Sequence, residues 1–485
     1  MTRLTPHDYQ EEALELMLAE PTRACLLASD MGRGKTLMAV EFALRIKAEL
    51  VLVVGVKDTW GQFNERFLAQ SGGTVGVKNI NSTASGKRAE ADLLWGIPGV
   101  YFIGAQLLTR KDWANEKKIR DGKEVSVGRR LKTFDNLELD LVIADEVHLY
   151  GAPTSRGRKT LMGLNPKYRV AMSGTFYGNK FQNAWAPTAW LWPDIVDQNF
   201  YSWKARWCLE EAVLTRRGTE LKKTLKSGEQ VVIKELKGEI PPEGRYVASL
   251  PLYIRHEDDM ELPEPRIVEV DLLPEQRRMY SELEDNLLTW IKGHPFAVEF
   301  PSTLAGRLRT ASLGSFSLDP ETDEITFDED MVSSKLDALL AEIERAGGER
   351  QVIGTHSKRY AREVARRMQG AGLRAVVWTG DTSTKKRSDI KQMWLDGDID
   401  FIVTVMKSFS TGLDWAKDGC NRMTVLSRPV GDGVTFDQWI KRVFRPGGDR
   451  EKFEWTEIIA RDTYDTGDFA SAELAAAVRR RSMGA

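Results

Sequence analysis

The chain has 485 residues, and its 69 Lys and Arg residues nearly balance its 71 Asp and Glu residues, giving a net charge of −2 at pH 7. This balance excludes a basic surface spread over the whole chain, so a nucleic-acid partner would have to be met by a local basic patch. No apolar run reaches the roughly 20 residues of a membrane span, and the N-terminus lacks the apolar core of a signal peptide. Three widely separated cysteines, Cys25, Cys208 and Cys420, exclude a disulfide framework, so we expect a cytoplasmic protein without membrane contact.

Short apolar runs alternate with helical patterns in two zones of the chain. In the first zone the runs lie at 24–28, 50–54, 100–103, 139–144 and 168–172. In the second zone they lie at 351–353, 375–378, 401–404 and 423–426, with helical patterns at 359–368 and 385–395. Such nearly continuous apolar runs indicate strands buried on both faces, as in parallel sheets. We therefore predict an α/β fold with two parallel-sheet lobes.

The segment between the two zones is rich in charged and aromatic residues, and its strand and helix patterns do not alternate cleanly. Within it, residues 274–290 have the apolar spacing of a helix. We predict three parts: an N-terminal lobe at 1–190, an insertion of helices and a ribbon at 191–332, and a C-terminal lobe at 333–485.

A glycine-containing loop, Ser-Asp-Met-Gly-Arg-Gly-Lys-Thr at 29–36, follows the first apolar run and precedes a helical pattern. Such a loop can direct backbone N–H groups at phosphate oxygens, and the helix N-terminus adds partial positive charge. Lys35 would then reach the β- and γ-phosphates, and the Thr36 hydroxyl would bind Mg²⁺. Ser29 replaces the first glycine of the strict pattern, so a simple strand-to-helix turn with an exposed lysine stays open as the alternative.

An acidic pair, Asp145 and Glu146, directly follows the apolar run at 139–144, and His148 follows two residues later. Carboxylates at the carboxyl end of a parallel strand face the ligand crevice of an α/β sheet. Asp145 could hold Mg²⁺ and Glu146 could polarise the attacking water. The alternative is the solvated start of a helix.

Gln438, Arg442 and Arg445 are spaced i, i+4 and i+7, which places them on one face of a predicted helix. Planar guanidinium groups suit the diffuse charge of a γ-phosphoryl transition state. Taken alone, such a stripe is more often a solvated or salt-bridged helix face.

In this order, the motifs resemble those of the superfamily two helicases and translocases, most closely the Swi/Snf-type double-stranded DNA translocases. The resemblance begins at Tyr9 and Gln10, continues through the phosphate loop and the acidic box, and ends at Arg445. One departure is the polar strand end 354–357, where the family has more apolar residues. The resemblance implies that ATP is bound by Gln10, Asp30, Met31, Gly32, Arg33, Gly34, Lys35, Thr36, Gly412 and Asp414.

The resemblance also assigns the other roles. It implies catalytic roles for Lys35, Asp145, Glu146, Arg442 and Arg445, and metal binding by Thr36 and Asp145. It implies that ATP hydrolysis is coupled to movement by His148, Ser173, Gly174, Thr175 and Gln438. Nucleic-acid contacts are expected from Thr109, Arg110, Thr355, Ser357, Thr379, Gly380 and Ser410.

The implied protein has two RecA-like lobes with a mixed helical and ribbon insertion, and it uses ATP and Mg²⁺ to move along DNA, duplex or branched, as a monomer. Two alternatives stay open: an RNA helicase, and a nucleic-acid-binding clamp without turnover. The compact layout also resembles helicases carried by bacteriophages, in which case the location would be the host cytoplasm.

Overall fold

The computed structural model describes residues 3–108, 113–120, 123–130, 137–178, 180–212, 220, 222–224, 230–232, 234–257, 262–286, 288–291, 294–297, 301–318, 324–327, 331–409, 420–429, 433–444 and 451–466. The chain divides into two compact units, the first ending at Asp258 and the second beginning at Asp259. The predicted insertion at 191–332 is thus shared between the two units, and the three-part division remains a prediction.

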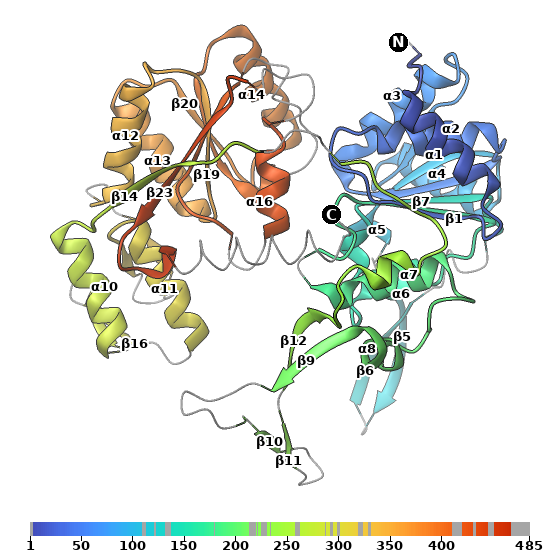
Figure 1. Cartoon of the computed structure of the whole chain (residues 1–485), viewed down its shortest axis with the longest axis horizontal. Helices are drawn as coiled ribbons and strands as arrows, with labels where there is room; N and C mark the ends of the chain where they lie inside the picture. The colour runs from blue at the N-terminus through green and yellow to red at the C-terminus, as the bar shows by residue number, and fades with distance from the viewer. Residues whose placement is uncertain are drawn as a thin grey trace. The chain divides into compact units, whose positions relative to one another are not determined.

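Unit 1 is built on a parallel sheet with the strand order β13-β1-β8-β7-β2-β4-β3 (Figure 1). Its strands are β1 (Ala24–Leu27), β2 (Leu50–Gly55), β3 (Val77–Ile80), β4 (Gly99–Gly104), β7 (Leu141–Asp145), β8 (Tyr168–Met172) and β13 (Tyr253–Ile254). Alternate residues of a central strand enter two separate cores, so that Leu52 packs on one face of the sheet and Val53 on the other. Covering both faces explains why the central strands β1, β2 and β7 are almost continuously apolar.

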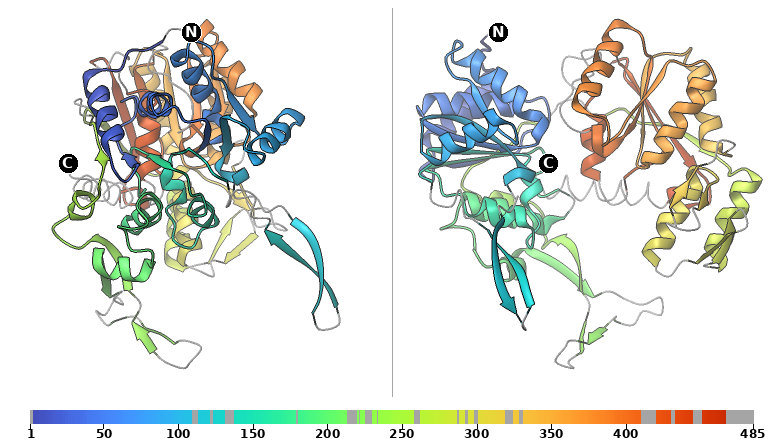
Figure 2. Two further views of the ribbon diagram at one scale, coloured as in Figure 1. Left: turned by 90° about the vertical axis from the view of Figure 1, so that its right-hand side faces the viewer. Right: turned by 180° about the vertical axis from the view of Figure 1, so that it is seen from behind.

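Helices cover both faces of this sheet, and two antiparallel ribbons stand out from unit 1 (Figure 2). The helices are α1 (Asp8–Ala19), α2 (Lys35–Arg45), η1 (Lys57–Thr59), α3 (Trp60–Gln70), α4 (Ala84–Leu94), α5 (Ala105–Leu108), η2 (Val147–Tyr150), α6 (Arg156–Leu161), η3 (Phe181–Ala184), α7 (Trp185–Leu191), α8 (Phe200–Trp207) and α9 (Arg245–Ala248). The ribbons pair β5 (Trp113–Arg120) with β6 (Lys123–Arg130), and β9 (Cys208–Ala212) with β12 (Lys234–Glu239); β10 (Lys222–Thr224) pairs with β11 (Gln230–Val232).

Unit 2 contains a second parallel sheet, with the strand order β14-β23-β22-β19-β21-β20. Its strands are β14 (Arg266–Val270), β19 (Gln351–Thr355), β20 (Ala375–Trp378), β21 (Phe401–Val405), β22 (Arg422–Val425) and β23 (Glu454–Ala460). The helices are α10 (Pro274–Asn286), α11 (Pro301–Leu313), α12 (Ser334–Arg345), α13 (Lys358–Gly370), α14 (Thr384–Asp396), α15 (Met406–Phe409) and α16 (Gly433–Ile440). Two short hairpins pair β15 (Leu288–Ile291) with β16 (His294–Ala297), and β17 (Ser317–Leu318) with β18 (Ile325–Thr326).

The two predicted parallel-sheet lobes are confirmed, and each apolar run of the sequence coincides with a strand. Four strands of the two parallel sheets, β3, β13, β14 and β23, were not predicted from the sequence. Two of the predicted helices were too long. The helix expected at 274–290 ends at Asn286, because the next residues enter the β15–β16 hairpin. The helix expected to carry Arg442 ends at Ile440 and continues as a turn, in which Arg442 N–H donates to the Trp439 carbonyl over 3.1 Å.

The glycine at the start of the strand end 354–357 has a packing reason. Gly354 lies in β19 under α16, and a Cβ atom built on it would lie 2.5 Å from Trp439 Cζ2 and 2.7 Å from Met406 Cε. Trp439 is fully buried there, and its indole N–H donates to Thr404 Oγ1 over 2.9 Å. A larger residue at this strand position would therefore displace the tryptophan.

We expect Gly354→Ala to destabilise unit 2 by roughly 1–3 kcal/mol, because the added methyl group overpacks a filled core. Urea unfolding followed by tryptophan fluorescence measures the change. Gly370→Ala, at the end of α13 with no atom within 4 Å of the added Cβ, is the matched control and should not destabilise the protein. Equal stabilities of the Gly354→Ala variant and the wild type would contradict this packing argument.

Candidate nucleotide site

Strand register brings the functional segments of unit 1 together at one edge of its sheet. Asp145 pairs with Met172, Met172 with Leu27, and Leu27 with Ile254, so four strand ends form one row across the sheet. Neighbouring strands are about 4.8 Å apart, so the outer members of the Asp145–Met172–Leu27 row are separated by roughly 10 Å. The segments that follow these strand ends can therefore reach a single nucleotide.

The phosphate loop joins β1 to α2, as the sequence predicted. Gly32 and Gly34 adopt left-handed backbone conformations, with φ of 83° and 76°. A Cβ atom on Gly34 would lie 2.2 Å from Gln10 Nε2, so glycine is required there both for its backbone conformation and for the space it leaves.

Gln10 lies on α1, is 3% exposed, and contacts the phosphate loop directly. Its Oε1 accepts the His7 N–H over 3.0 Å, and its Nε2 donates to the Arg33 carbonyl over 3.1 Å and to Tyr9 Oη over 3.0 Å. These partners fix the orientation of the amide, because a carbonyl must face the N–H and an NH₂ must face the carbonyl. Oε1 keeps a second lone pair, which could accept a hydrogen bond from an amino group such as that of adenine.

Lys35 is the first residue of α2, and its ammonium group lies inside the curve of the loop. Nζ donates to the Ser29 carbonyl over 2.6 Å and to the Asp30 carbonyl over 3.0 Å. Gly174 lies over the same place, since a Cβ atom built on it would be 3.9 Å from Lys35 Nζ and 3.5 Å from the Ser29 carbonyl oxygen. The loop after β8 therefore lies close enough to Lys35 to change its contacts when Lys35 binds a ligand.

Glu146 follows β7 in a left-handed backbone conformation, with φ of 47°. For a residue with a Cβ atom this conformation costs about 1–2 kcal/mol, and such strain is concentrated at functional sites. The Glu146 N–H donates to Asp145 Oδ1 over 3.0 Å, so the turn also holds the neighbouring carboxylate.

His148 connects the acidic pair to the loop after β8. Its Nδ1 lies 3.0 Å from Ser173 Oγ and 3.2 Å from Glu146 Oε2. Ser173 is fully buried, donates to Glu146 Oε2 over 3.4 Å, and accepts the Thr175 N–H over 3.2 Å. The structure thus brings together Glu146, His148, Ser173 and Thr175, four residues for which the sequence predicted roles in one site.

The Asp145 carboxyl group carries an unusual pKa. Burial at the strand end and the adjacent charge of Glu146 raise it to about 7, although Lys35 acts in the opposite direction. Two carboxylates crowded at a strand end form a place where a cation is favoured.

The oxygen donors of the site fit Mg²⁺. This ion prefers hard oxygen ligands and is often held by one or two carboxylates together with substrate phosphates. Thr36 stands in the first turn of α2, and the buried Thr175 Oγ1 has no hydrogen-bond partner among the described residues. Among these residues there is no group of three or more His, Cys, Asp and Glu side chains that could hold a metal by itself.

The remaining candidate residues are divided between unit 2 and the undescribed parts of the chain. Gln438 lies on α16 and Arg442 in the turn after it, both partly exposed. Thr355 and Thr379 are buried at strand ends, where Thr355 Oγ1 lies 2.9 Å from Ser427 Oγ. Among the expected nucleic-acid contacts, Ser357 is partly exposed and Gly380 is exposed. The described ranges do not include Thr109, Arg110, Ser410, Gly412, Asp414 or Arg445.

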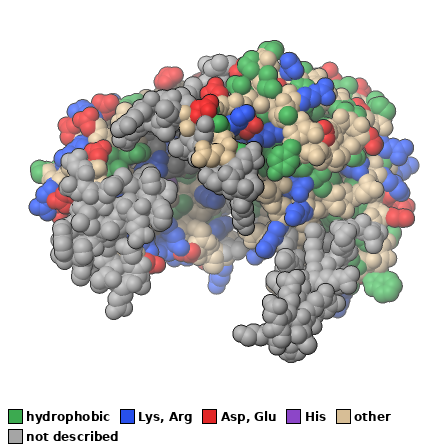
Figure 3. Space-filling model, turned by 90° about the horizontal axis from the view of Figure 1, so that it is seen from below, with side chains coloured by type: hydrophobic (Ala, Val, Ile, Leu, Met, Phe, Trp, Pro, Cys, Tyr) green, Lys and Arg blue, Asp and Glu red, His purple; other side chains and the backbone are tan. Residues whose placement is uncertain are grey.

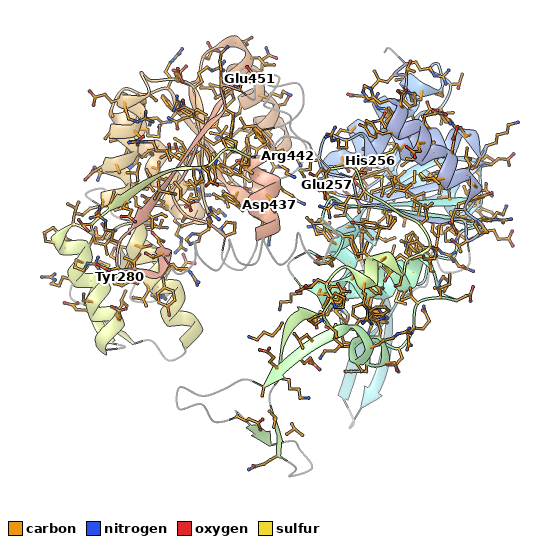
Figure 4. All side chains as sticks on the ribbon, viewed as in Figure 1. His256, Glu257, Tyr280, Asp437, Arg442 and Glu451 are labelled. Carbon is orange, nitrogen blue, oxygen red and sulfur yellow. The ribbon has the colours of Figure 1, made fainter. Side chains whose placement is uncertain are left out.

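His256, labelled in Figure 4, was not predicted from the sequence. It follows β13, and its ring contacts Ser29 at the start of the phosphate loop. The two residues are 227 positions apart in the chain. The replacement of the first loop glycine by serine was the one signal that pointed to an unusual contact there.

Comparison with known proteins agrees with this reading. Residues 3–178 match the family model described as Type III restriction enzyme, res subunit. A stretch of 206 residues, 40% of this chain, is 21% identical to the DNA excision repair protein ERCC-6-like 2 of Mus musculus, and the match spans 13% of that protein's length. Each of these two matches covers less than half of this chain, and both are in line with the resemblance of its motifs to superfamily two helicases and translocases.

One solved structure is similar over the whole chain but only distantly. The Sulfolobus solfataricus SWI2/SNF2 ATPase core in complex with dsDNA covers 100% of this chain, with 98% of its own length matched, at 18% identity and a TM-score of 0.41. At this distance the likeness carries no argument about the site. Among the described residues, no helix has both the length and the apolar character needed to cross a membrane.

We expect Asp145→Asn to raise the free energy of unfolding of the metal-free protein by roughly 1–3 kcal/mol near pH 8, because it removes a carboxylate that burial disfavours. The pKa rises from an ordinary 3.8 to about 7 on folding, so the folded state retains a proton that the unfolded state releases. The contribution of Asp145 to stability is therefore present at low pH and is lost as the pH rises through about 7.

Unfolding of the wild type and the variant at a series of pH values, without divalent cations, measures this effect. The stability difference should be smallest below about pH 4, widen up to about pH 7 and then level off. A difference that does not change with pH would contradict the raised pKa.

Proposed function

We propose that this chain is a nucleic-acid-stimulated ATPase that couples ATP hydrolysis to movement along DNA. The observation that carries the proposal is the contact set at the sheet edge of unit 1. The strained Glu146 meets His148 and Ser173, while Gly174 lies against the loop that holds Lys35. A simple turn with a solvated lysine would need neither the strain nor the shared hydrogen bonds.

Each residue of this set has a role in ATP hydrolysis. Lys35 would exchange its two carbonyl partners for phosphate oxygens, and Gln10 would accept a hydrogen bond from the adenine amino group. Glu146, placed beyond the end of β7, would orient and polarise the attacking water. Thr36 and Asp145 would hold Mg²⁺. When bound, this ion would neutralise part of the phosphate charge.

His148 and Ser173 can relay the state of the nucleotide to the loop after β8. Ser173 shares Glu146 Oε2 with His148, and the next residue, Gly174, lies over Lys35. A change in what Glu146 or Lys35 binds therefore changes the hydrogen bonds of the 173–175 loop.

The expected contributions of Gln438 and Arg442 to turnover stay predictions.

DNA is the partner we propose, bound by a monomer. The matched mouse protein is named as a DNA excision repair protein, and the motif order is that of double-stranded DNA translocases. Basic and acidic side chains are interspersed on the face drawn in Figure 3, in line with the net charge of −2. We therefore expect local phosphate contacts, from groups such as Ser357 and the backbone at Gly380, and not one extended basic face.

We expect ATP turnover to rise on addition of duplex or branched DNA and to change little on addition of RNA, because the proposed track is a duplex DNA backbone. Steady-state phosphate release with no nucleic acid, duplex DNA, branched DNA, single-stranded DNA and RNA measures this. Glu146→Gln is the matched variant. It should bind ATP as the wild type does, while its turnover falls by about 10²–10⁴, because the isosteric amide cannot accept a proton.

Each other outcome contradicts part of the proposal. Stimulation by RNA alone would identify an RNA helicase. ATP binding without turnover under any condition would identify a clamp. Unchanged turnover of Glu146→Gln would exclude this residue as the group that activates water.

A further inference from the structure

The segment that leads out of unit 1 is hydrogen-bonded to the phosphate loop. β13 pairs in parallel with β1, and the contact continues beyond the ends of both strands. The Ala28 N–H donates to the Ile254 carbonyl over 2.8 Å, and the Asp30 N–H donates to the His256 carbonyl over 2.9 Å. Unit 1 ends at Asp258, so these are among the last residues before the chain enters unit 2.

A side-chain contact reinforces this pairing. Ser29 is fully buried, and its Oγ accepts the backbone N–H of His256 over 3.1 Å and lies 3.2 Å from His256 Nδ1. Since Oγ already accepts one hydrogen, its own O–H can donate to Nδ1 of a neutral imidazole. Burial lowers the pKa of His256, which favours this neutral form.

The His256 ring also packs against the residue next to Gln10. The ring centroids of Tyr9 and His256 are 4.7 Å apart, and Tyr9 Oη donates to the Arg33 carbonyl over 3.3 Å. His256 therefore contacts the phosphate loop directly at Ser29, its first residue. Through Tyr9 it also contacts the loop at Arg33, next to Gly34.

These contacts connect His256 to the ammonium group of Lys35, which would bind phosphate. His256 binds Ser29 through its side chain and Asp30 through its carbonyl oxygen. The carbonyl oxygens of the same two residues hold Lys35 Nζ. A glycine in place of Ser29, as in the strict loop pattern, would keep the backbone–backbone bonds and lose both the contact with the imidazole and the acceptor of the His256 N–H.

We propose that His256 is a positioning residue for the nucleotide: through Ser29 it fixes the start of the phosphate loop, and so ties nucleotide binding to the segment that leaves unit 1. The inference rests on the proposed function only in taking ATP as the ligand. Coupling of this kind is reciprocal, so a bound nucleotide stabilises the 253–257 segment by as much as that segment strengthens nucleotide binding.

A double-mutant cycle in the full chain tests the contact. The dissociation constant of a fluorescent, non-hydrolysable ATP analogue is measured for the wild type, His256→Ala, Ser29→Ala and the double variant. His256→Ala should bind about five- to tenfold more weakly, the effect of the lost ring contact, and Ser29→Ala at least as much more weakly, because it also removes the acceptor of the His256 backbone N–H. The double variant should bind no more weakly than Ser29→Ala, which already lacks both hydrogen bonds.

Two further substitutions of His256 separate its hydrogen bond from its packing. His256→Asn keeps a group that can pair with the Ser29 hydroxyl and should restore affinity to within about twofold of the wild type. His256→Phe keeps a ring beside Tyr9 without a ring nitrogen, and it should behave as His256→Ala does. Hydrogen exchange of residues 253–257 should slow when the analogue binds to the wild type, and should slow less in Ser29→Ala.

Three results would overturn the inference: affinity of His256→Ala within about twofold of the wild type, losses that multiply in the double variant, or equal losses in His256→Asn and His256→Ala. None of these measurements contains nucleic acid. A wild type that DNA does not stimulate would contradict the proposed function and leave the result for His256 intact.

Discussion

The candidate site depends on the parallel register of four neighbouring strands in unit 1. Because β7, β8, β1 and β13 end in one row, the acidic turn, the 173–175 loop, the phosphate loop and the exit segment all begin at the same sheet edge. A shift of any of these strands by one residue would turn its side chains to the opposite face. The two apolar cores on either side of the sheet hold the register in place, and the chemistry of the site is built on that constraint.

The strands and the loop glycines could be predicted from the sequence because their causes are local. Buried parallel strands need continuous apolar runs, and a loop around phosphate needs glycines at particular positions. The missed strands lack that signature. β3 contains the exposed Lys78, β13 has two residues, and β14 is a partly exposed edge strand. Two helices were predicted to be too long because the helical spacing of apolar residues continues past Asn286 and Ile440. After Asn286 the chain enters the β15–β16 hairpin, and after Ile440 it forms a turn.

The parts of the site that could not be predicted are long-range or strained. No sequence pattern indicates that Glu146 adopts a left-handed conformation, since this depends on the turn that β7 makes at the sheet edge. The contact between Ser29 and His256 joins residues 227 positions apart and follows from the place of β13 beside β1. The left-handed conformation of Glu146 has a cost in stability, and so does the burial that raises the pKa of Asp145. Such costs are expected where function and folding make different demands on the same residues.

The central claim is that Lys35, held by two carbonyl oxygens in the phosphate loop, is the group that receives a triphosphate. Calorimetric titration of ATP with Mg²⁺ into the wild type and Lys35→Ala tests it most directly, with Lys87→Ala, an exposed lysine on α4, as the control. We expect saturable binding by the wild type and Lys87→Ala, and binding about 10- to 100-fold weaker by Lys35→Ala, because a charged hydrogen-bond donor is lost. Equal affinity of all three proteins for ATP would contradict it.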